Sequence, residues 1–110
     1  MPIETIELKR AQMRKGLLEF CILLVISEGR VYSSDILNKL KAADLLVVEG
    51  TLYPLLNRLK TQELITYEWE ESRSGPPRKY FKLTPDGRST LAQLKDTWTS
   101  LKASIKSLEQ

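Results

Sequence analysis

The chain has 110 residues, with 17 Lys and Arg, 14 Asp and Glu, no His and one Cys. This length suits one domain with at most an appended element, and the net charge of +3 permits a polyanionic partner without requiring one. The absence of His excludes Ser-His-Asp and Cys-His catalysis and His-bound metals, and a single Cys excludes an internal disulfide or a multi-thiolate zinc site.

The first 28 residues predict two helical segments. Residues 3–15 mix charged and apolar side chains without a clean period, which indicates a short, partly exposed helix or arm with a basic cluster. Residues 15–28 are apolar on nearly every side, which predicts a buried helix that ends at Gly29. The apolar run Leu17–Ile26 is about half the length of a membrane helix, and the charged N-terminus is unlike a signal peptide. We therefore expect a cytoplasmic protein without a membrane segment.

A second helix is expected after a short extended connector at residues 30–32. The triplet Ser33-Ser34-Asp35 predicts its start, with a hydroxyl capping the free N–H groups and the carboxylate at the positive end of the helix dipole. This helix is expected to end at about Ala43.

A third helix is expected from about Gly50 to Gln62. Its apolar residues follow the i, i+3, i+4, i+7 pattern of a one-sided helix and are Leu52, Leu55, Leu56 and Leu59. Pro54 lies near the fourth or fifth helical position, where a backbone N–H normally bonds to the preceding turn. We therefore expect a distorted or late first turn.

The following segment predicts a β-hairpin and the start of a last helix. Residues 65–71 alternate β-forming and polar side chains, residues 79–83 form a second strand, and residues 73–78 are rich in turn formers. Thr84-Pro85-Asp86 then combines a hydroxyl N-cap with Pro and an acid in the first turn. The order α-α-α-β-β-α is that of a winged helix-turn-helix. We expect an α+β, mainly α, fold with this domain at residues 1–84 and a C-terminal dimerisation helix at 85–110.

The third helix has a polar face opposite its leucines, and this face suits DNA. At 100° per residue it consists of Gly50, Pro54, Asn57 and Thr61, flanked by Thr51, Tyr53 and Arg58. Asn and Arg suit bidentate contacts to bases, and Tyr and Thr hydroxyls suit phosphates. The hairpin adds a basic tip with Arg73, Arg78 and Lys79. The alternative is an ordinary solvated helix face, although such faces are usually rich in Lys and Glu.

Two motifs resemble the PadR family of transcriptional regulators. Residues 49–59, EGTLYPLLNRL, resemble the recognition-helix signature of that family. Residues 75–87, GPPRKYFKLTPDG, resemble its wing and the junction to the next helix, and Leu64-Ile65 matches its strand-opening pair. The resemblance spans about residues 13–95. One departure is Pro76-Pro77, where relatives often carry an Arg, and it removes one charge from the wing.

The resemblance implies a homodimeric repressor that binds an inverted repeat in double-stranded DNA. Carried over by position, the DNA contacts would be Thr51, Tyr53 and Pro54 from the third helix, Ser33 or Ser34 from the second, and Arg78 and Lys79 from the wing. The side-chain chemistry itself adds Asn57 and Arg58 as candidates.

The last helix carries a strict heptad seam. Its apolar residues are spaced 3, 4, 3, 4 and 3 apart and are Leu91, Leu94, Trp98, Leu101, Ile105 and Leu108. So narrow a stripe predicts packing on a second subunit. About two and a half heptads are marginal alone, so residues 3–15 are expected to add surface. The alternative is a helix that folds back on its own domain.

Trp98 stands at a heptad a position and indicates an apolar site between subunits, able to stack on a flat ligand. Small members of the resembled family, which end at a single C-terminal helix, include regulators that bind planar drugs at such a place. The resemblance therefore implies a small aromatic or planar effector. Its other candidate contacts are Leu94, Leu101 and, from the partner subunit, Met13 or Leu17. The alternative is that Trp98 fills an ordinary dimer core.

The function that these features favour is a DNA-binding transcriptional regulator. The alternative is a winged-helix module that binds another protein, which the acidic strand residues Glu68, Glu70 and Glu71 support. Cys21 lies in the apolar run and is interpreted as a small hydrophobe rather than a redox switch. Nothing in the sequence assembles a nucleophile, a base or a metal site, so we expect neither an enzyme nor a cofactor.

Overall fold

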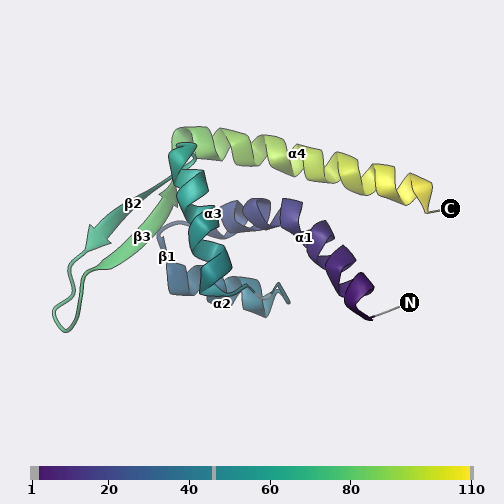
Figure 1. Ribbon diagram of the computed structural model, residues 1–110. Helices are drawn as coiled ribbons and strands as arrows, with labels where there is room; N and C mark the ends of the chain where they lie inside the picture. The colour runs from purple at the N-terminus through teal and green to yellow at the C-terminus, as the bar shows by residue number, and fades with distance from the viewer. Residues whose placement is uncertain (1–2, 46, 110) are drawn as a thin grey trace.

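The computed structural model describes residues 3–45 and 47–109. In chain order its elements are α1 (Ile3–Ile26), β1 (Val31–Tyr32), α2 (Ser33–Ala42), α3 (Glu49–Thr61), β2 (Ile65–Glu70), β3 (Arg78–Leu83) and α4 (Pro85–Leu108). The predicted winged-helix architecture is confirmed: the β2–β3 hairpin projects from one end of the helical body, and α4 extends toward the other (Figure 1). No helix in the described ranges is long and apolar enough to cross a membrane.

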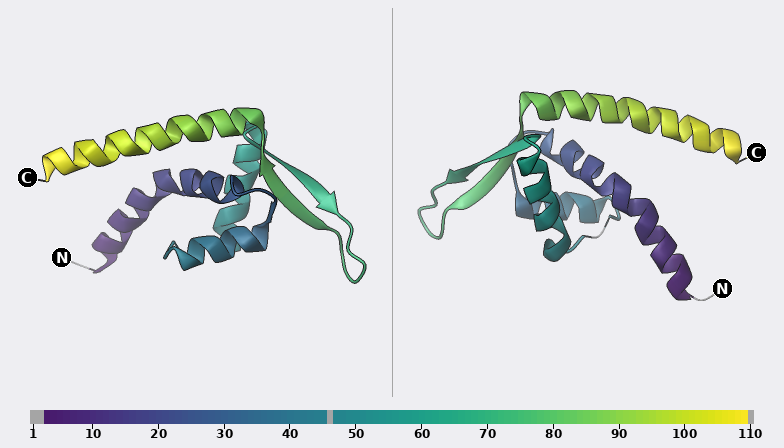
Figure 2. Two further views of the ribbon diagram at one scale, coloured as in Figure 1. Left: turned by 180° about the vertical axis from the view of Figure 1, so that it is seen from behind. Right: turned by 45° about the horizontal axis from the view of Figure 1, so that its top comes forward.

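Helix α1 is continuous, whereas the sequence indicated an arm followed by a separate buried helix. The residues in its C-terminal half that face the core are fully buried, namely Ile22, Leu23 and Ile26. Its N-terminal half is exposed and diverges from α4, as both views of Figure 2 show. The helix ends at Ile26 rather than at Gly29, which follows a turn and adopts a φ of +130°. Glycine accepts this left-handed conformation without a side-chain clash.

The connector before α2 is a strand, which the sequence did not separate from a loop. Strand β1 pairs antiparallel with β3, so that Val31 faces Phe81 and Tyr32 faces Tyr80, and the sheet order is β1-β3-β2. The expected serine cap is wrong: the N-cap of α2 is Tyr32, and no side chain caps it. Instead, the Asp35 carboxylate accepts a hydrogen bond of 2.9 Å from the Tyr32 backbone N–H.

Helix α3 begins at Glu49 and passes through Pro54 without a break, so the expected late first turn is wrong. The N–H groups of Thr51 and Leu52 both donate to the Val48 carbonyl at 3.0 Å, which closes the first turn upstream of the proline. The leucine stripe is confirmed, because its members at 52, 56 and 59 are almost fully buried in the core.

The first turns of α4 belong to the same hydrophobic core as the winged domain. The predicted cap is confirmed, since the Thr84 hydroxyl accepts a hydrogen bond of 2.9 Å from the Gly87 N–H. Gly87 is buried against the Leu64 backbone, and Leu91 is only 4% exposed. Leu94 packs partly against this core. Beyond it, α4 meets α1 at Trp98 and then extends away from the core (Figure 1).

Candidate nucleic-acid interface

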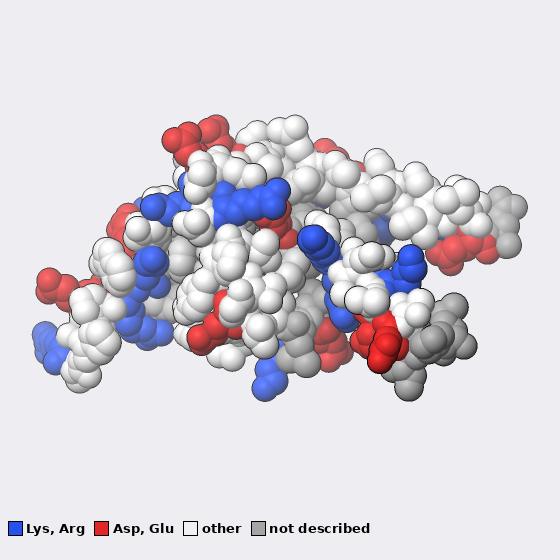
Figure 3. Space-filling view, in the orientation of Figure 1, with Lys and Arg blue, Asp and Glu red and all other residues white. Residues whose placement is uncertain are grey.

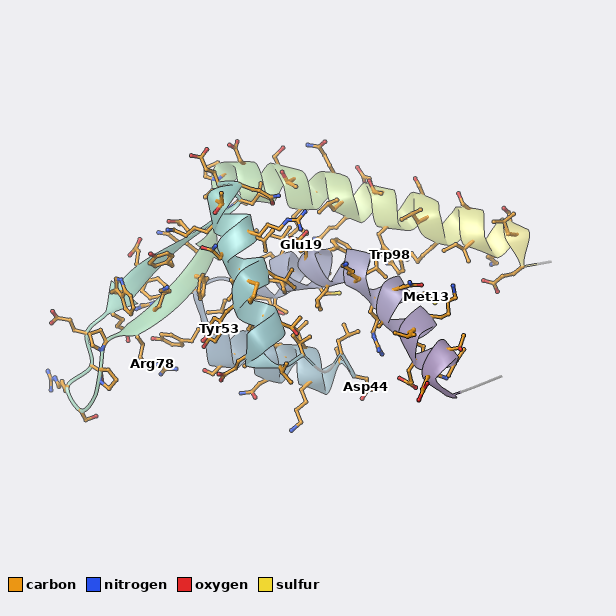
Figure 4. The ribbon with its side chains drawn as sticks, in the orientation of Figure 1. Met13, Glu19, Asp44, Tyr53, Arg78 and Trp98 are labelled. Atoms are coloured by element: carbon orange, nitrogen blue, oxygen red, sulfur yellow. The ribbon has the colours of Figure 1, made fainter. Side chains whose placement is uncertain are left out.

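A cleft of about 540 Å³ lies between the start of α2, the outer face of α3 and the hairpin. Six of the residues predicted to contact DNA line it together: Ser33, Ser34, Tyr53, Asn57, Arg78 and Lys79. Figure 4 shows Tyr53 on α3 and Arg78 on the hairpin at the two sides of this cleft. The structure therefore gathers side chains from positions as far apart as 33 and 79 into one concave surface.

The α3 side of the cleft is polar and partly pre-arranged. Tyr53 is 48% exposed, and its phenol oxygen lies 3.4 Å from the Ser33 hydroxyl oxygen, which connects α3 to the start of α2. Asn57 is exposed and presents its amide to the cleft. The exposed Thr61 hydroxyl is engaged within the helix, since it donates to the Asn57 carbonyl at 2.9 Å. The open hydroxyl and amide groups on this face are therefore those of Tyr53 and Asn57.

The remaining predicted residues lie elsewhere. Gly50, Thr51 and Pro54 are exposed on α3 but do not line the cleft, and Arg73 is exposed in the hairpin turn. Arg58 points toward α1, where its Nε lies 3.5 Å from the Glu19 carboxylate. One carboxylate oxygen of Glu19 is buried, so the arginine supplies a compensating charge for it.

Three cations that line the cleft, two from β3 and one from α3, lie against aromatic rings. The Arg78 guanidinium is 3.8 Å from the centre of the Tyr32 ring. The ammonium groups of Lys79 and Lys60 are 4.1 Å and 4.7 Å from the centre of the Tyr67 ring. Cation–π attraction restrains these long side chains beside the cleft. Among the described residues, no carboxylate lies within ion-pair distance of any of the three.

Three cleft residues are outside the set predicted from the sequence to contact DNA: Tyr32, Lys60 and Tyr67. Tyr67 carried a usable signal, because strand alternation places it on the face that β3 extends with Lys79 and Phe81. The contribution of Lys60 depends on how α3 packs beside β2, and that packing has no local sequence signature.

The acidic residues of β2 lie on the opposite face of the sheet and are paired. Glu68 accepts a hydrogen bond of 2.6 Å from the Tyr80 phenol and forms an ion pair of 2.9 Å with Lys82. These two partners lower the pKa of Glu68, and Glu68 in turn raises the pKa of both Tyr80 and Lys82. Glu70 accepts a hydrogen bond of 2.9 Å from the Tyr32 phenol and pairs with Arg30. Glu68 and Glu70 therefore belong to a network that balances its own charge.

Figure 3 shows Lys and Arg side chains spread over the hairpin and along its border with α3, with a few acidic side chains among them. The basic cluster expected on residues 3–15 is partly balanced as well, because Arg10 pairs with Glu7 at 3.0 Å. The described residues contain no group of three or more acidic or thiol side chains that could hold a metal ion. Cys21 is half-buried, and burial raises the pKa of its thiol.

The apolar seam of α4 divides into two parts. Leu91 is buried in the core of its own chain, which leaves it little surface for a partner, whereas Leu101 and Ile105 are about half exposed and Leu108 is 85% exposed. The exposed half of α1 likewise presents Ile6, Leu8 and Met13 to solvent. These two exposed apolar sets lie beyond the winged domain.

Trp98 lies between the two helices and points from α4 toward α1 (Figure 4). It lines a hollow of about 120 Å³ together with Gly16, Leu17, Phe20, Leu94, Thr97 and Leu101. Leu17 thus meets Trp98 within one chain, whereas the expectation from the sequence was a contact from the partner subunit. Met13 is 76% exposed and does not line this hollow.

Comparison with known proteins adds a family and several related structures. The model of the transcriptional regulator PadR-like family matches residues 22–93. A PadR-like transcription factor from Bacteroides fragilis is 54% identical, with 90% of this chain and 96% of that chain covered and a TM-score of 0.79. A PadR-like transcriptional regulator from Bacillus cereus is 38% identical, with 90% and 97% covered and a TM-score of 0.79. A PadR family transcriptional regulator from Eggerthella lenta is 27% identical, with 97% and 94% covered and a TM-score of 0.88.

Proposed function

The chain belongs to the PadR-like family of transcriptional regulators, and we propose that it represses transcription by binding an inverted repeat in double-stranded DNA as a homodimer. One observation carries this proposal: the cleft brings hydroxyls, an amide and three cations without carboxylate partners onto one surface. Such a surface attracts a polyanion and also offers groups that can read bases.

In the proposed complex, α3 enters the major groove, whose width admits a helix. Tyr53 and Asn57 face the DNA from the middle of α3, and Gly50, Thr51 and Pro54 approach it from the first turns. Ser33 and Ser34 lie at the start of α2, where N–H groups and hydroxyls suit a phosphate. The hairpin then brings Arg78 and Lys79, with Arg73 beyond them, to the adjacent backbone or minor groove.

The pairing of the β2 acids favours DNA over a protein partner. The sequence supported a protein-binding module because Glu68 and Glu70 could have presented a negative surface. In the structure these carboxylates are engaged by Lys82 and Arg30 on the sheet face that carries Tyr80. Among the described residues, the cations that line the cleft have no such partners, which leaves the cleft positively charged.

DNA binding is tested by selecting an operator from a random duplex library and titrating it by fluorescence anisotropy over a range of salt concentrations. The logarithm of the binding constant should fall linearly with the logarithm of the salt concentration. Asn57→Ala should lose about 1–3 kcal/mol of discrimination at one base pair if the amide reads a base. Lys95→Ala, an exposed lysine on α4, is the matched control and should bind like the unmodified chain. Salt-independent affinity would refute DNA binding.

A second copy of the chain is proposed to cover the exposed apolar residues of α1 and α4. Ile105→Glu would place a charge in this interface and should yield monomers in sedimentation velocity. Thr99→Glu adds the same charge about 140° around the helix from the seam and should leave the dimer intact. A dimer that tolerates Ile105→Glu and dissociates with Thr99→Glu would contradict this placement of the interface.

The proposal also includes a site for a small planar effector at Trp98. The hollow of about 120 Å³ in one chain is smaller than a drug-sized site, so two hollows would have to join across the dimer. Leu94, Leu101 and Leu17 would line it from each chain, and Met13 could contribute only from the partner subunit. An effector would act through its different affinities for two arrangements of the dimer.

The effector site is tested through Trp98 fluorescence in a Trp69→Phe background. Planar aromatic compounds at micromolar concentration should change this emission and weaken operator binding together. A shielded Trp98 that no such compound perturbs would mean that the residue fills an ordinary dimer core.

A further inference from the structure

Trp69 is a large aromatic residue exposed near the outer end of β2. It is 63% exposed, whereas on the same strand face Ile65 is buried and Tyr67 is half-buried. The sheet register sets Trp69 opposite Lys79 and Tyr67 opposite Phe81. Because Tyr67, Lys79 and Phe81 line the cleft, Trp69 continues the cleft wall outward along the hairpin. Its exposure shows that Trp69 is not a core residue.

Lys79 is held between the rings of Tyr67 and Trp69. Its ammonium nitrogen lies 4.1 Å from the centre of the Tyr67 ring and 5.2 Å from that of Trp69. The two rings meet edge to face at 6.3 Å with an interplanar angle of 87°. This arrangement restrains a flexible side chain before any ligand arrives, so less conformational entropy is lost on binding.

We propose that Trp69 and Lys79 form a single contact for the DNA backbone, an inference that rests on the proposed function. The Lys79 ammonium contacts a phosphate, and the exposed indole packs on the apolar face of the neighbouring deoxyribose. Tyr67 is a positioning residue, because it holds Lys79 from the side of the cleft.

The charge around Trp69 selects this ligand over an apolar protein surface. Arg78, Lys79 and Lys60 lie at the same cleft, and no carboxylate in the described ranges pairs with them. An apolar partner that covered Trp69 would have to bury these charges without compensation, which is costly. A sugar–phosphate backbone supplies an apolar surface and an anion at the spacing of one nucleotide.

The first test uses Trp69 as its own reporter. In a Trp98→Phe background, the emission of Trp69 should change on titration with a mixed-sequence duplex of about 30 base pairs at low salt, where binding is non-specific. The change should saturate together with the anisotropy of the labelled duplex. Saturating anisotropy with unchanged Trp69 emission would overturn the inference while leaving DNA binding in place.

The second test separates the indole from the cation. Trp69→Ala should weaken binding about fivefold to tenfold, as expected for the loss of an exposed cation–π and apolar contact, and Trp69→Phe should recover most of this loss. The salt slope should stay unchanged in Trp69→Ala, whereas Lys79→Ala should reduce it by about one. Equal affinities for the unmodified chain and Trp69→Ala would overturn the inference. Absence of salt-dependent binding by the unmodified chain would instead refute the proposed function.

Discussion

Replacing Gly87 by Ala tests the joint between the winged domain and α4. A Cβ atom at this position would overlap the Leu64 carbonyl oxygen and stand 2.9 Å from the carbonyl carbon. The obstacle is backbone, so it cannot rotate away. The same carbonyl accepts a hydrogen bond of 3.1 Å from the Thr84 N–H, so shifting it would also disturb the start of α4.

The size of the effect follows from two opposing terms. Overpacking a close contact costs about 1–3 kcal/mol, and contact with fixed backbone belongs at or above the upper end of that range. Ala in place of Gly within a helix stabilises the folded state by about 1 kcal/mol, because Ala has the higher helix propensity. We therefore expect Gly87→Ala to lower the free energy of unfolding by about 2 kcal/mol, which corresponds to about 10 °C in Tm for a domain of this size.

Urea denaturation followed by circular dichroism measures this loss, with all variants at one protein concentration because dimerisation would add to stability. Gly16→Ala is the matched control: it also lies inside a helix, but an added Cβ meets no atom within 4 Å. It should stabilise the protein by up to about 1 kcal/mol. If Gly87→Ala were stabilised to the same extent, the close approach of α4 to Leu64 would be disproved.

Three further predictions concern the wing network, α3 and the α4 cap. The pKa of Glu68 is lowered by its phenol and ammonium partners, so its contribution to stability is present above about pH 4.5 and is lost as the pH falls through the folded-state pKa. Glu68→Gln should therefore be less stable than the unmodified chain at neutral pH, and the difference should disappear in acid unfolding titrations. Arg58→Ala should reduce operator affinity less than Asn57→Ala in the same anisotropy assay, because Arg58 points toward α1; a larger loss would place Arg58 on the DNA. Thr84→Ala removes the acceptor of the Gly87 N–H and should cost about 1 kcal/mol in urea denaturation, whereas Thr84→Ser should keep most of it.

The elements with a local signature could be predicted from the sequence. The leucine periodicity of α3 and the Thr84-Pro85 start of α4 each involve neighbouring residues, and both are found as expected. Strand β1 escaped prediction because its two residues, Val31 and Tyr32, are a strand only through pairing with β3 about 50 positions later. The continuity of α1 was not predicted for a different reason. Its two halves differ in burial and therefore in hydrophobic pattern, although they share one helical backbone.

Six residues of the candidate site could be predicted from the sequence, whereas the way in which they are arranged around the cleft could not. Helical angle placed Tyr53 and Asn57 on one face correctly. The same reasoning placed Arg58 beside them, whereas its long side chain reaches the opposite way to Glu19. The aromatic rings under the wing cations depend on sheet register and on the packing of α3 beside β2, neither of which follows from the local sequence around Arg78.

Tyr32 belongs to three parts of the molecule at once. It pairs with Tyr80 in the sheet, is the N-cap of α2, and provides the ring beneath Arg78. The hairpin therefore cannot change its angle to the helices without breaking this residue's contacts, including its hydrogen bond to Glu70. In the proposed complex, α3 lies in one groove and the hairpin lies on the neighbouring backbone, so the distance between these two contacts is fixed by the protein. DNA whose minor-groove width matches this distance would bind best. Because groove width varies with base composition, base pairs that no side chain touches would contribute to operator preference.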